Sequence, residues 1–177
     1  MDAPVRPPTS SLAAAEGFPI TLQLNGFEHT THVQPWVTLL DLLREEVHLT
    51  GTKKGCDHGQ CGACTVLLDG KRVNSCLQLA VAVDGSTVQT IEGLGTDAQG
   101  MRELDPLQQA FMDHDAFQCG YCTPGQICSA RGLLSEGKAR TREEVRELMS
   151  GNLCRCGAYT NITDAVMSVL SSEGAAK

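Results

Sequence analysis

The sequence predicts an α+β protein, in which a small mixed β-sheet crossed by a helix is followed by a compact group of about four helices. In the first half, alternating apolar residues flank two turn dipeptides. In the second half, helix-capping pairs recur at short intervals. Nine cysteines in 177 residues are too many for ordinary packing and too few for a small disulfide-stapled scaffold. The first two observations predict the fold, and the third suggests that thiolates bind something soft.

A β-hairpin and a helix open the first half of the chain. Residues 20–24 alternate apolar and polar, and Asn25-Gly26 tolerates positive φ at both turn centres, so residues 27–33 are expected to return as a second strand. Thr38, with Asp41 three residues later, can cap a helix. The apolar stripe of that helix consists of Leu39, Leu40, Leu42, Leu43 and Val47.

A second hairpin and one more strand complete the predicted sheet. Residues 65–68 and 71–73 flank the turn dipeptide Asp69-Gly70, and residues 87–91 have the composition of a further strand. The first half is therefore expected to be a small mixed sheet crossed by a helix.

Three capping signals and one apolar stripe predict the helices of the second half. Asp105-Pro106 is an N-cap followed by proline at the first helical position, and Thr123-Pro124 repeats that device. Residues 141–144 form a capping box. Apolar residues at spacings of three and four over 162–170 predict a last amphipathic helix. Together these signals predict a compact bundle of about four short helices.

Changes in composition divide the chain into four segments. Residues 1–17, rich in proline, serine and threonine, bury little apolar surface and are expected to form a mobile arm. Residues 18–95 are the predicted sheet domain, and the polar stretch 96–103 is the predicted linker. The helical domain is expected to span residues 104–172.

Charge and hydropathy exclude two classes of partner. The chain has 21 acidic and 14 basic residues and a net charge of −7, the wrong sign for binding a phosphate backbone. No apolar run approaches the roughly 18 residues that a bilayer helix needs. We therefore expect neither nucleic acid nor a membrane as partner.

Four cysteines around the second hairpin form the first candidate metal site. Cys56, Cys61 and Cys64 share one glycine-rich loop and Cys76 follows the hairpin, which gives the spacing C-x4-C-x2-C-x11-C. The opening of this pattern is that of plant-type ferredoxins, whose four thiolates hold a [2Fe-2S] cluster. Zinc also takes four thiolates, but its cysteines usually come as pairs of C-x2-4-C knuckles. The spacing favours iron-sulfur over zinc.

Glycines in the first loop are expected to serve the cluster. Without a Cβ they can take positive φ and bring backbone N–H groups close to sulfur. These glycines are Gly51, Gly55, Gly59 and Gly62. His58 lies in the same loop, and with four cysteines available we expect it to face solvent rather than to bind metal.

The second candidate site has the spacing C-x2-C-x31-C-x-C. It consists of Cys119, Cys122, Cys154 and Cys156, among helix ends whose amides can face the sulfurs. This spacing alone could serve zinc, although a C-x-C pair is unusual for zinc ribbons. The ninth cysteine, Cys128, is expected to be a small buried side chain on the helix after Cys122, with a substitute ligand or redox thiol as the alternative.

Three stretches resemble the small iron-sulfur subunit of molybdenum hydroxylases, the xanthine oxidase family. They are residues 51–66, 117–125 and 150–162, and the resemblance spans residues 18–170. Within that family, residues 56–61 and 151–159 are most similar to bacterial aldehyde oxidoreductases with three separate subunits.

The resemblance implies a fold and a set of cofactors. A β-grasp ferredoxin-like domain would hold the first [2Fe-2S] cluster, and a four-helix domain would hold the second, with Gly120 and Gly157 joining Gly55, Gly59 and Gly62 as residues of the cluster loops. Gln118 would hydrogen-bond the pterin of molybdopterin cytosine dinucleotide. The molybdenum cofactor and FAD would lie on a large and a medium partner subunit, in an αβγ assembly that is either single or dimerised.

The resemblance also implies an electron-transfer function. The chain would pass electrons one at a time from the molybdenum cofactor through two clusters to FAD, in an enzyme that converts an aldehyde and water to a carboxylic acid. The same subunit could serve a xanthine, carbon monoxide or N-heterocycle dehydrogenase. A free-standing ferredoxin and a zinc-stabilised interaction module without redox activity are the alternatives from other classes.

The start of the chain differs from that of periplasmic relatives. Those relatives carry a twin-arginine leader on this subunit, and residues 1–17 contain nothing similar. We therefore expect a cytoplasmic enzyme, or a periplasmic one if a leader is missing from this sequence.

Overall fold

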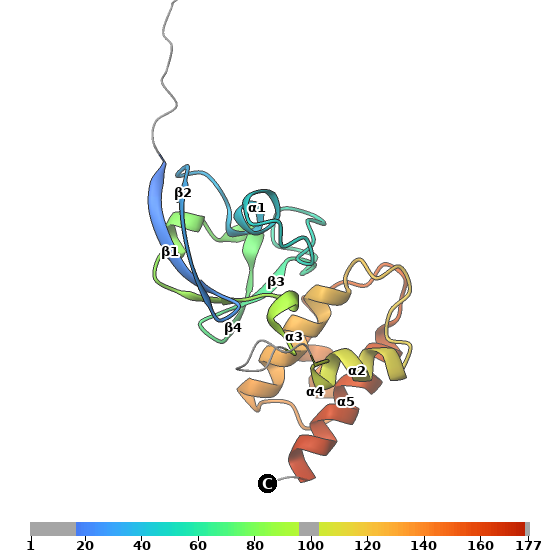
Figure 1. The fold of residues 1–177 in the computed structure, drawn as a ribbon. Helices are drawn as coiled ribbons and strands as arrows, with labels where there is room; N and C mark the ends of the chain where they lie inside the picture. The colour runs from blue at the N-terminus through green and yellow to red at the C-terminus, as the bar shows by residue number, and fades with distance from the viewer. Residues whose placement is uncertain (1–16, 96–102, 176–177) are drawn as a thin grey trace, which may run out of the picture.

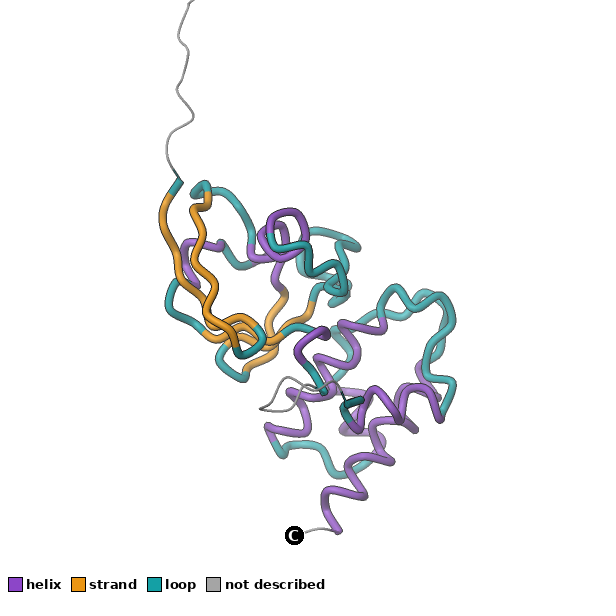
Figure 2. Tube along the Cα trace, viewed as in Figure 1, coloured by secondary structure: helices purple, strands orange, loops and turns teal. Residues whose placement is uncertain are grey.

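The computed structural model describes residues 17–95 and 103–175. Within them, all the strands lie in the N-terminal half of the chain, and helices α2 to α5 gather in the C-terminal half (Figures 1 and 2). The predicted α+β arrangement is confirmed. The predicted arm, apart from Gly17, and the predicted linker, apart from Glu103, lie outside the described residues.

A mixed five-stranded sheet forms the N-terminal half. Its strands are β1 (Phe18–Leu24), β2 (Phe27–Val33), β3 (Thr65–Leu68), β4 (Lys71–Asn74) and β5 (Thr87–Gln89), in the order β2-β1-β5-β3-β4. β1 and β5 run parallel, whereas the other neighbours are antiparallel. Both turn dipeptides adopt positive φ, at 51° and 87° in Asn25-Gly26 and at 49° and 75° in Asp69-Gly70.

The predicted helix crosses the sheet. Thr38 Oγ1 accepts a hydrogen bond from the Asp41 N–H at 3.1 Å, so the predicted cap is present. The helix begins as α1 (Leu39–Asp41) and continues as a π-helical turn (Leu42–Glu46). The four leucines of its stripe are completely buried, and Leu40 packs against Cys64 and Cys76. The helix therefore covers the sheet and also supports the first cysteine set.

The last strand is shorter than the sequence predicts. β5 ends at Gln89, and Ile91–Gly93 is one of three short 3-10 helices, with Ser75–Leu77 and Ala80–Val83. Thr90 ends the strand because its N–H donates to Asn25 Oδ1 at 2.8 Å, which replaces a bond to a neighbouring strand.

Four helices form the C-terminal half of the described chain. They are α2 (Pro106–Asp113), α3 (Thr123–Glu136), α4 (Arg142–Leu148) and α5 (Tyr159–Ala175). The predicted caps at Asp105 and Thr141 are both present as capping boxes. α3 and α5 are longer than the predicted short helices, with 14 and 17 residues.

The predicted cap of α3 is wrong by one residue. The helix already includes Thr123, and its N-cap is Cys122, because the Gln126 N–H bonds to Cys122 O at 2.9 Å. The Thr123 hydroxyl is consequently buried without a hydrogen-bond partner. The start of α3 is thus set by a cysteine of the second set.

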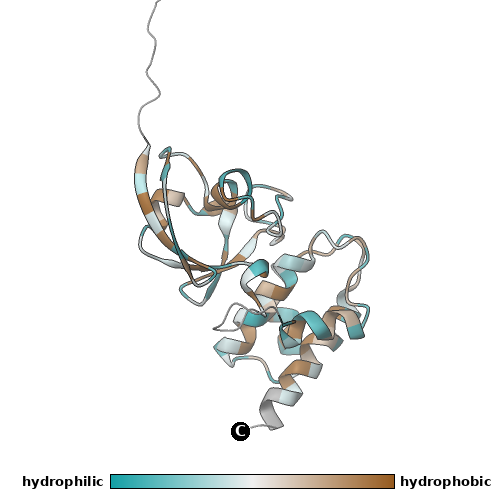
Figure 3. Cartoon of the chain, viewed as in Figure 1, coloured by the Kyte–Doolittle hydropathy of each residue, from teal (hydrophilic) through white to brown (hydrophobic). Residues whose placement is uncertain are grey.

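Each half has its own apolar core. Figure 3 shows apolar residues recurring along β1 and along α5, and two separate clusters of buried side chains correspond to the two halves. None of the helices in residues 17–95 and 103–175 combines the length and apolarity needed to cross a bilayer.

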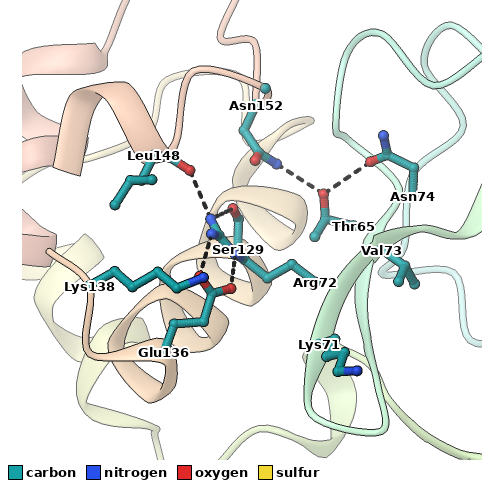
Figure 4. A pocket seen from close by; sticks show the side chains of 11 residues that line it. Thr65, Lys71, Arg72, Val73, Asn74, Ser129, Glu136, Lys138, Leu148 and Asn152 are labelled. Carbon is teal, nitrogen blue, oxygen red and sulfur yellow. Dashed lines mark hydrogen bonds and ion pairs between the residues drawn. The ribbon is translucent and has the colours of Figure 1, made fainter. Parts of the chain in front are cut away.

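The two halves meet where α3 packs on β3 and β4. A Cβ on Gly132 of α3 would lie 2.9 Å from Arg72 Cδ and 3.0 Å from Leu67 Cδ2, so any other residue there would displace the Arg72 side chain. The Arg72 guanidinium crosses from β4 and donates to both carboxylate oxygens of Glu136, at 2.8 and 3.0 Å, and to Leu148 O at 2.8 Å (Figure 4). Arg72 therefore joins the sheet to α3 and α4.

Candidate metal centres

The loop before β3 brings the first cysteine set together. Cys56 Sγ accepts hydrogen bonds from the backbone N–H groups of Gln60 at 3.3 Å and Cys61 at 3.4 Å. Backbone donors, first that of His58 and then those of Cys61 and Gln60, lower the pKa of the Cys56 thiol to about 6. The loop thus stabilises a thiolate, which is the form that binds metal.

The other end of this set is buried. Cys64 and Cys76 are 3% and 7% exposed. Burial, followed by the neighbouring Cys64 thiol, raises the pKa of Cys76 to about 12. As thiolates, these two buried side chains would repel each other, and a bound ferric centre would supply the compensating positive charge.

The loop glycines divide into two kinds. Gly59 and Gly62 take the expected positive φ, at 80° and 67°. Gly51 and Gly55 do not, so that expectation is wrong for them. A Cβ on Gly55 would lie 2.8 Å from Cys61 Sγ, so glycine is needed there for space around a sulfur and not for backbone conformation.

Asp57 and His58 complete the description of the first loop. Asp57 has a φ of 61°, a left-handed conformation that sequence reasoning did not anticipate in this loop. The His58 side chain is exposed, as expected, and lies 3.2 Å from Gln60 Oε1.

The second cysteine set lies at three helix ends. Cys119 and Cys122 precede α3, and Cys154 and Cys156 lie between α4 and α5. Burial, followed by the Cys154 thiol, raises the pKa of Cys122 to about 12. The pKa of Cys119 is lowered, first by the backbone N–H of Tyr121 and then by the Cys156 side chain.

Two glycines shape the second set. Gly120 and Gly157 take positive φ, at 78° and 77°. Gly120 directly follows Cys119, and Gly157 directly follows Cys156. This placement is expected of residues that turn the backbone around a cluster.

The eight thiols come as four pairs. Neighbouring side chains are Cys56 with Cys61, Cys64 with Cys76, Cys119 with Cys156, and Cys122 with Cys154. Among the described residues, no three His, Cys, Asp or Glu side chains converge on one metal ion. In a [2Fe-2S] cluster four thiolates are shared between two irons. Two pairs in each set therefore fit the donor pattern of such a cluster.

Both cysteine sets open onto one cavity. Its volume is about 640 Å³, and its lining includes Gly55 and Cys61 from the first set and Cys119, Cys122 and Cys154 from the second. The exposed aromatic side chains of Tyr121 and Tyr159 also line it. Gln118 is exposed directly beside Cys119.

The ninth cysteine is separate from both sets. All nine cysteines lie within the described residues and are free thiols. Cys128 is 1% exposed and belongs to the core of the helical half. Burial, aided by the acidic groups of Glu92 and Asp105, raises its pKa to about 12. This environment agrees with the expected packing role.

Sequence reasoning gave no role to Asn152, Leu153 or Tyr121 as contacts between the sets. The Leu153 N–H donates to Cys61 O at 2.9 Å, and the Tyr121 hydroxyl donates to Lys54 O at 2.7 Å. Asn152 Nδ2 donates to Gly62 O at 2.9 Å. Their partners lie 67 residues or more away along the chain, so no local pattern could have identified them.

Two sequence profiles cover most of the chain. The 2Fe-2S iron-sulfur cluster binding domain matches residues 22–90, and the [2Fe-2S] binding domain matches residues 90–167. Each matched region contains one complete cysteine set.

The most similar relatives include subunits of two kinds of enzyme. The aldehyde oxidoreductase iron-sulfur-binding subunit PaoA of Escherichia coli (strain K12) is 50% identical over 182 residues, which span 90% of this chain and 78% of PaoA. The nicotine 6-hydroxylase small subunit of Paenarthrobacter nicotinovorans is 49% identical over 148 residues, 84% of this chain and 87% of that one.

Solved structures agree with these relatives. Quinoline 2-oxidoreductase from Pseudomonas putida 86 matches with a TM-score of 0.81 and 46% identity, over 89% of this chain and 94% of that chain. The aldehyde oxidoreductase from Desulfovibrio desulfuricans matches with a TM-score of 0.81 and 42% identity, over 90% of this chain but 17% of that chain. The sequence therefore belongs to the small iron-sulfur subunits of the molybdenum hydroxylase family, with a ferredoxin-like domain followed by a helical [2Fe-2S]-binding domain.

Proposed function

We propose that this chain is the electron relay of a molybdenum-dependent aldehyde oxidoreductase. The observation that carries the proposal is the presence of two sets of four paired thiols, each with backbone donors or burial suited to a cluster. The 50% identity to an aldehyde oxidoreductase subunit supports the choice of substrate class. The reaction would convert an aldehyde and water to a carboxylic acid at a partner subunit.

The two clusters would have separate ligand sets and domains. Cys56, Cys61, Cys64 and Cys76 would hold the first, and Cys119, Cys122, Cys154 and Cys156 the second. We assign the first to a domain at residues 18–95 and the second to a domain at residues 104–172. A bound [2Fe-2S] cluster supplies one-electron transfer. The N–H donors of Gln60 and Cys61 would stabilise the negative charge on the Cys56 sulfur.

Two partner subunits would complete the enzyme. The exposed Gln118 side chain, beside Cys119, is available to hydrogen-bond the pterin of a molybdopterin cytosine dinucleotide on a large subunit. The medium subunit would bind FAD and accept electrons from the relay. Relatives described as small subunits support an assembly of several chains.

N-heterocycle hydroxylation is the second candidate. It is favoured by the 49% identity to a nicotine 6-hydroxylase subunit and by the match to quinoline 2-oxidoreductase. Both reactions would use the same relay, because the substrate site would lie on the large subunit.

Metal analysis and a substrate test separate these functions. The anaerobically purified complex is expected to contain about four irons and four acid-labile sulfides per copy of this chain. About two zinc ions and a colourless protein would instead support the interaction module. Reduction of both clusters by benzaldehyde, but not by nicotine or quinoline, supports the aldehyde enzyme, and the reverse supports the N-heterocycle enzyme. Co-purification of molybdenum and flavin subunits excludes a free-standing ferredoxin.

Arg155 is expected to raise the reduction potential of the second cluster. It lies between Cys154 and Cys156, lines the shared cavity and forms no ion pair with a described residue. Changing Arg155 to Glu places a negative charge where a positive one stood, so the reduced cluster becomes less favourable. We expect a downward shift of roughly 20 to 60 mV, because the exposed charge is screened by solvent.

A redox titration followed by electron paramagnetic resonance measures this shift. Lys54→Glu is the comparison for the first set, since Lys54 is already paired with Asp41 at 2.6 Å and Asp57 at 3.4 Å. An unchanged second potential in Arg155→Glu contradicts the assignment.

Changing Cys128 to Ala is expected to retain both clusters. The side chain belongs to the helical core, so its loss leaves a small cavity and lowers the free energy of unfolding by about 1 to 2 kcal/mol. Iron content and urea unfolding measure the two effects. Loss of about two irons would assign a ligand role to Cys128.

A further inference from the structure

The two cysteine loops approach so closely that two glycines in the contact have no room for a Cβ. A Cβ on Gly125, in the first turn of α3, would lie 3.0 Å from Ala63 Cα and still closer to Gly62 O. A Cβ on Gly62 would lie 2.6 Å from both Gly151 O and Asn152 Nδ2. Gly62 lies between Cys61 and Cys64, and Gly125 follows Cys122 by three residues. The contact therefore joins the loops that carry the two sets.

Asn152 fills the centre of this contact. Its side-chain amide lies within hydrogen-bond distance of Gly62 O at 2.9 Å, Thr65 Oγ1 at 3.0 Å and Gly125 O at 3.2 Å. The residue is 8% exposed. An amide has two N–H groups, which are here shared among acceptors from the loops of both sets. Figure 4 shows the side chain directed from the helical half toward Thr65 at the start of β3.

The backbone of Asn152 is held as firmly as its side chain. Gln126, which is 1% exposed, donates from Nε2 to Asn152 O at 2.8 Å. The next residue, Leu153, donates its N–H to Cys61 O at 2.9 Å. Cys154 of the second set follows directly. The residue after Asn152 is therefore joined to Cys61 of the first set by a hydrogen bond and to Cys154 of the second set by a peptide bond.

We propose that Asn152 is a positioning residue that fixes the separation and orientation of the two cluster-binding loops. The proposal rests on the function proposed above, because it requires that both loops hold clusters. Asn152 acts through the backbone of the loops and touches no thiol in its hydrogen bonds. The acceptors of its buried amide lie on both sides of the contact, at Gly62 and Thr65 on one side and at Gly125 on the other, so no shift of one loop against the other keeps all of its bonds.

Magnetic coupling between the reduced clusters provides a direct test. When both clusters of the full chain carry an unpaired electron, their dipolar interaction splits the electron paramagnetic resonance signals, and this splitting falls with the cube of the separation. Asn152→Asp keeps the size of the side chain but places an acceptor against the oxygens of Gly62 and Gly125. We expect this variant to lose the wild-type splitting or to show a smaller, broader one.

Arg72→Met is the matched control. Arg72 also joins the two halves, but it bonds to Glu136 and Leu148 and to neither cysteine loop. It is expected to lower stability and to retain the wild-type splitting. A purely structural role for Asn152 would lower stability in the same way without a change of splitting, so the two roles give different results.

Iron and sulfide counts keep the two proposals distinguishable. A wild-type chain with fewer than two clusters contradicts the proposed function, whereas a fully loaded Asn152→Asp chain with unchanged splitting contradicts only the role of Asn152. If that variant loses iron, Asn152→Ser decides, because its shorter side chain retains one donor. Reduced splitting in Asn152→Ser supports the proposal, and wild-type splitting overturns it.

Discussion

Replacing Cys119 with serine is expected to remove the second cluster and leave the first, and replacing Cys61 with serine is expected to do the reverse. Thiolate is the metal-binding form of cysteine, and a serine hydroxyl stays protonated at neutral pH. Each variant should retain about two of four irons. Iron and sulfide analysis, with electron paramagnetic resonance of the reduced protein, distinguishes the two losses.

The pairing of thiols makes this prediction sharper. Cys119 neighbours Cys156, and Cys61 neighbours Cys56. Each change therefore removes one of the two thiolates of a pair and leaves the other cysteine of that pair as a single donor. The two sets lie in halves with separate cores, and neither serine replacement removes the backbone hydrogen bond of Leu153 to Cys61 that joins their loops, so the loss should not spread from one set to the other. Cys128→Ala is the control for substitution of a cysteine as such. Retention of both signals in Cys119→Ser contradicts the ligand assignment.

Local chemistry made much of the fold predictable. Asn25-Gly26 and Asp69-Gly70 form the expected turns because their positive φ values need nothing from the rest of the chain. Asp105 and Thr141 cap their helices for the same reason, since each cap bonds to residues two or three positions later. The spacing of the cysteines likewise indicated two sets of four.

Contacts between distant residues account for the expectations that failed. β5 ends early because Asn25, 65 residues before Thr90, takes the N–H of that threonine. Gly55 is needed for room around Cys61 Sγ, and not for positive φ. The partner of Asn152 at Gly62 lies 90 residues away. Such pairings depend on how the two halves pack, and no local pattern in one chain reveals that packing.

Removing the Arg72 guanidinium is expected to lower the free energy of unfolding by about 2 to 4 kcal/mol. Its side chain is 19% exposed and that of Glu136 is 26% exposed, so their paired bonds are partly shielded from water. One charge-assisted hydrogen bond contributes about 1.5 to 3 kcal/mol, and the three bonds of this single guanidinium do not add in full because water partly screens the ion pair. The change also leaves Leu148 O without this donor. Arg72→Met is the suitable variant, because its unbranched stem can still pack on Gly132. Urea unfolding followed by far-ultraviolet circular dichroism measures the effect.

Lys138→Met is the matched control for Arg72→Met. Lys138 Nζ lies 3.6 Å from the same Glu136 carboxylate, but its side chain is 67% exposed, so its removal should cost less than about 1 kcal/mol. A double-mutant cycle with Glu136→Gln separates the pair energy from the loss of the Leu148 bond. The pKa of the Glu136 carboxyl is lowered, first by the hydrogen bond from Arg72. The ion pair therefore stabilises the fold fully at pH values above the ordinary pKa of Glu, and this stabilisation is lost as the pH falls through the lowered pKa. Equal costs for the Arg72 and Lys138 variants would contradict a stabilising bond between the halves at Arg72, since of these two residues Arg72 is the one that reaches from β4 to α3.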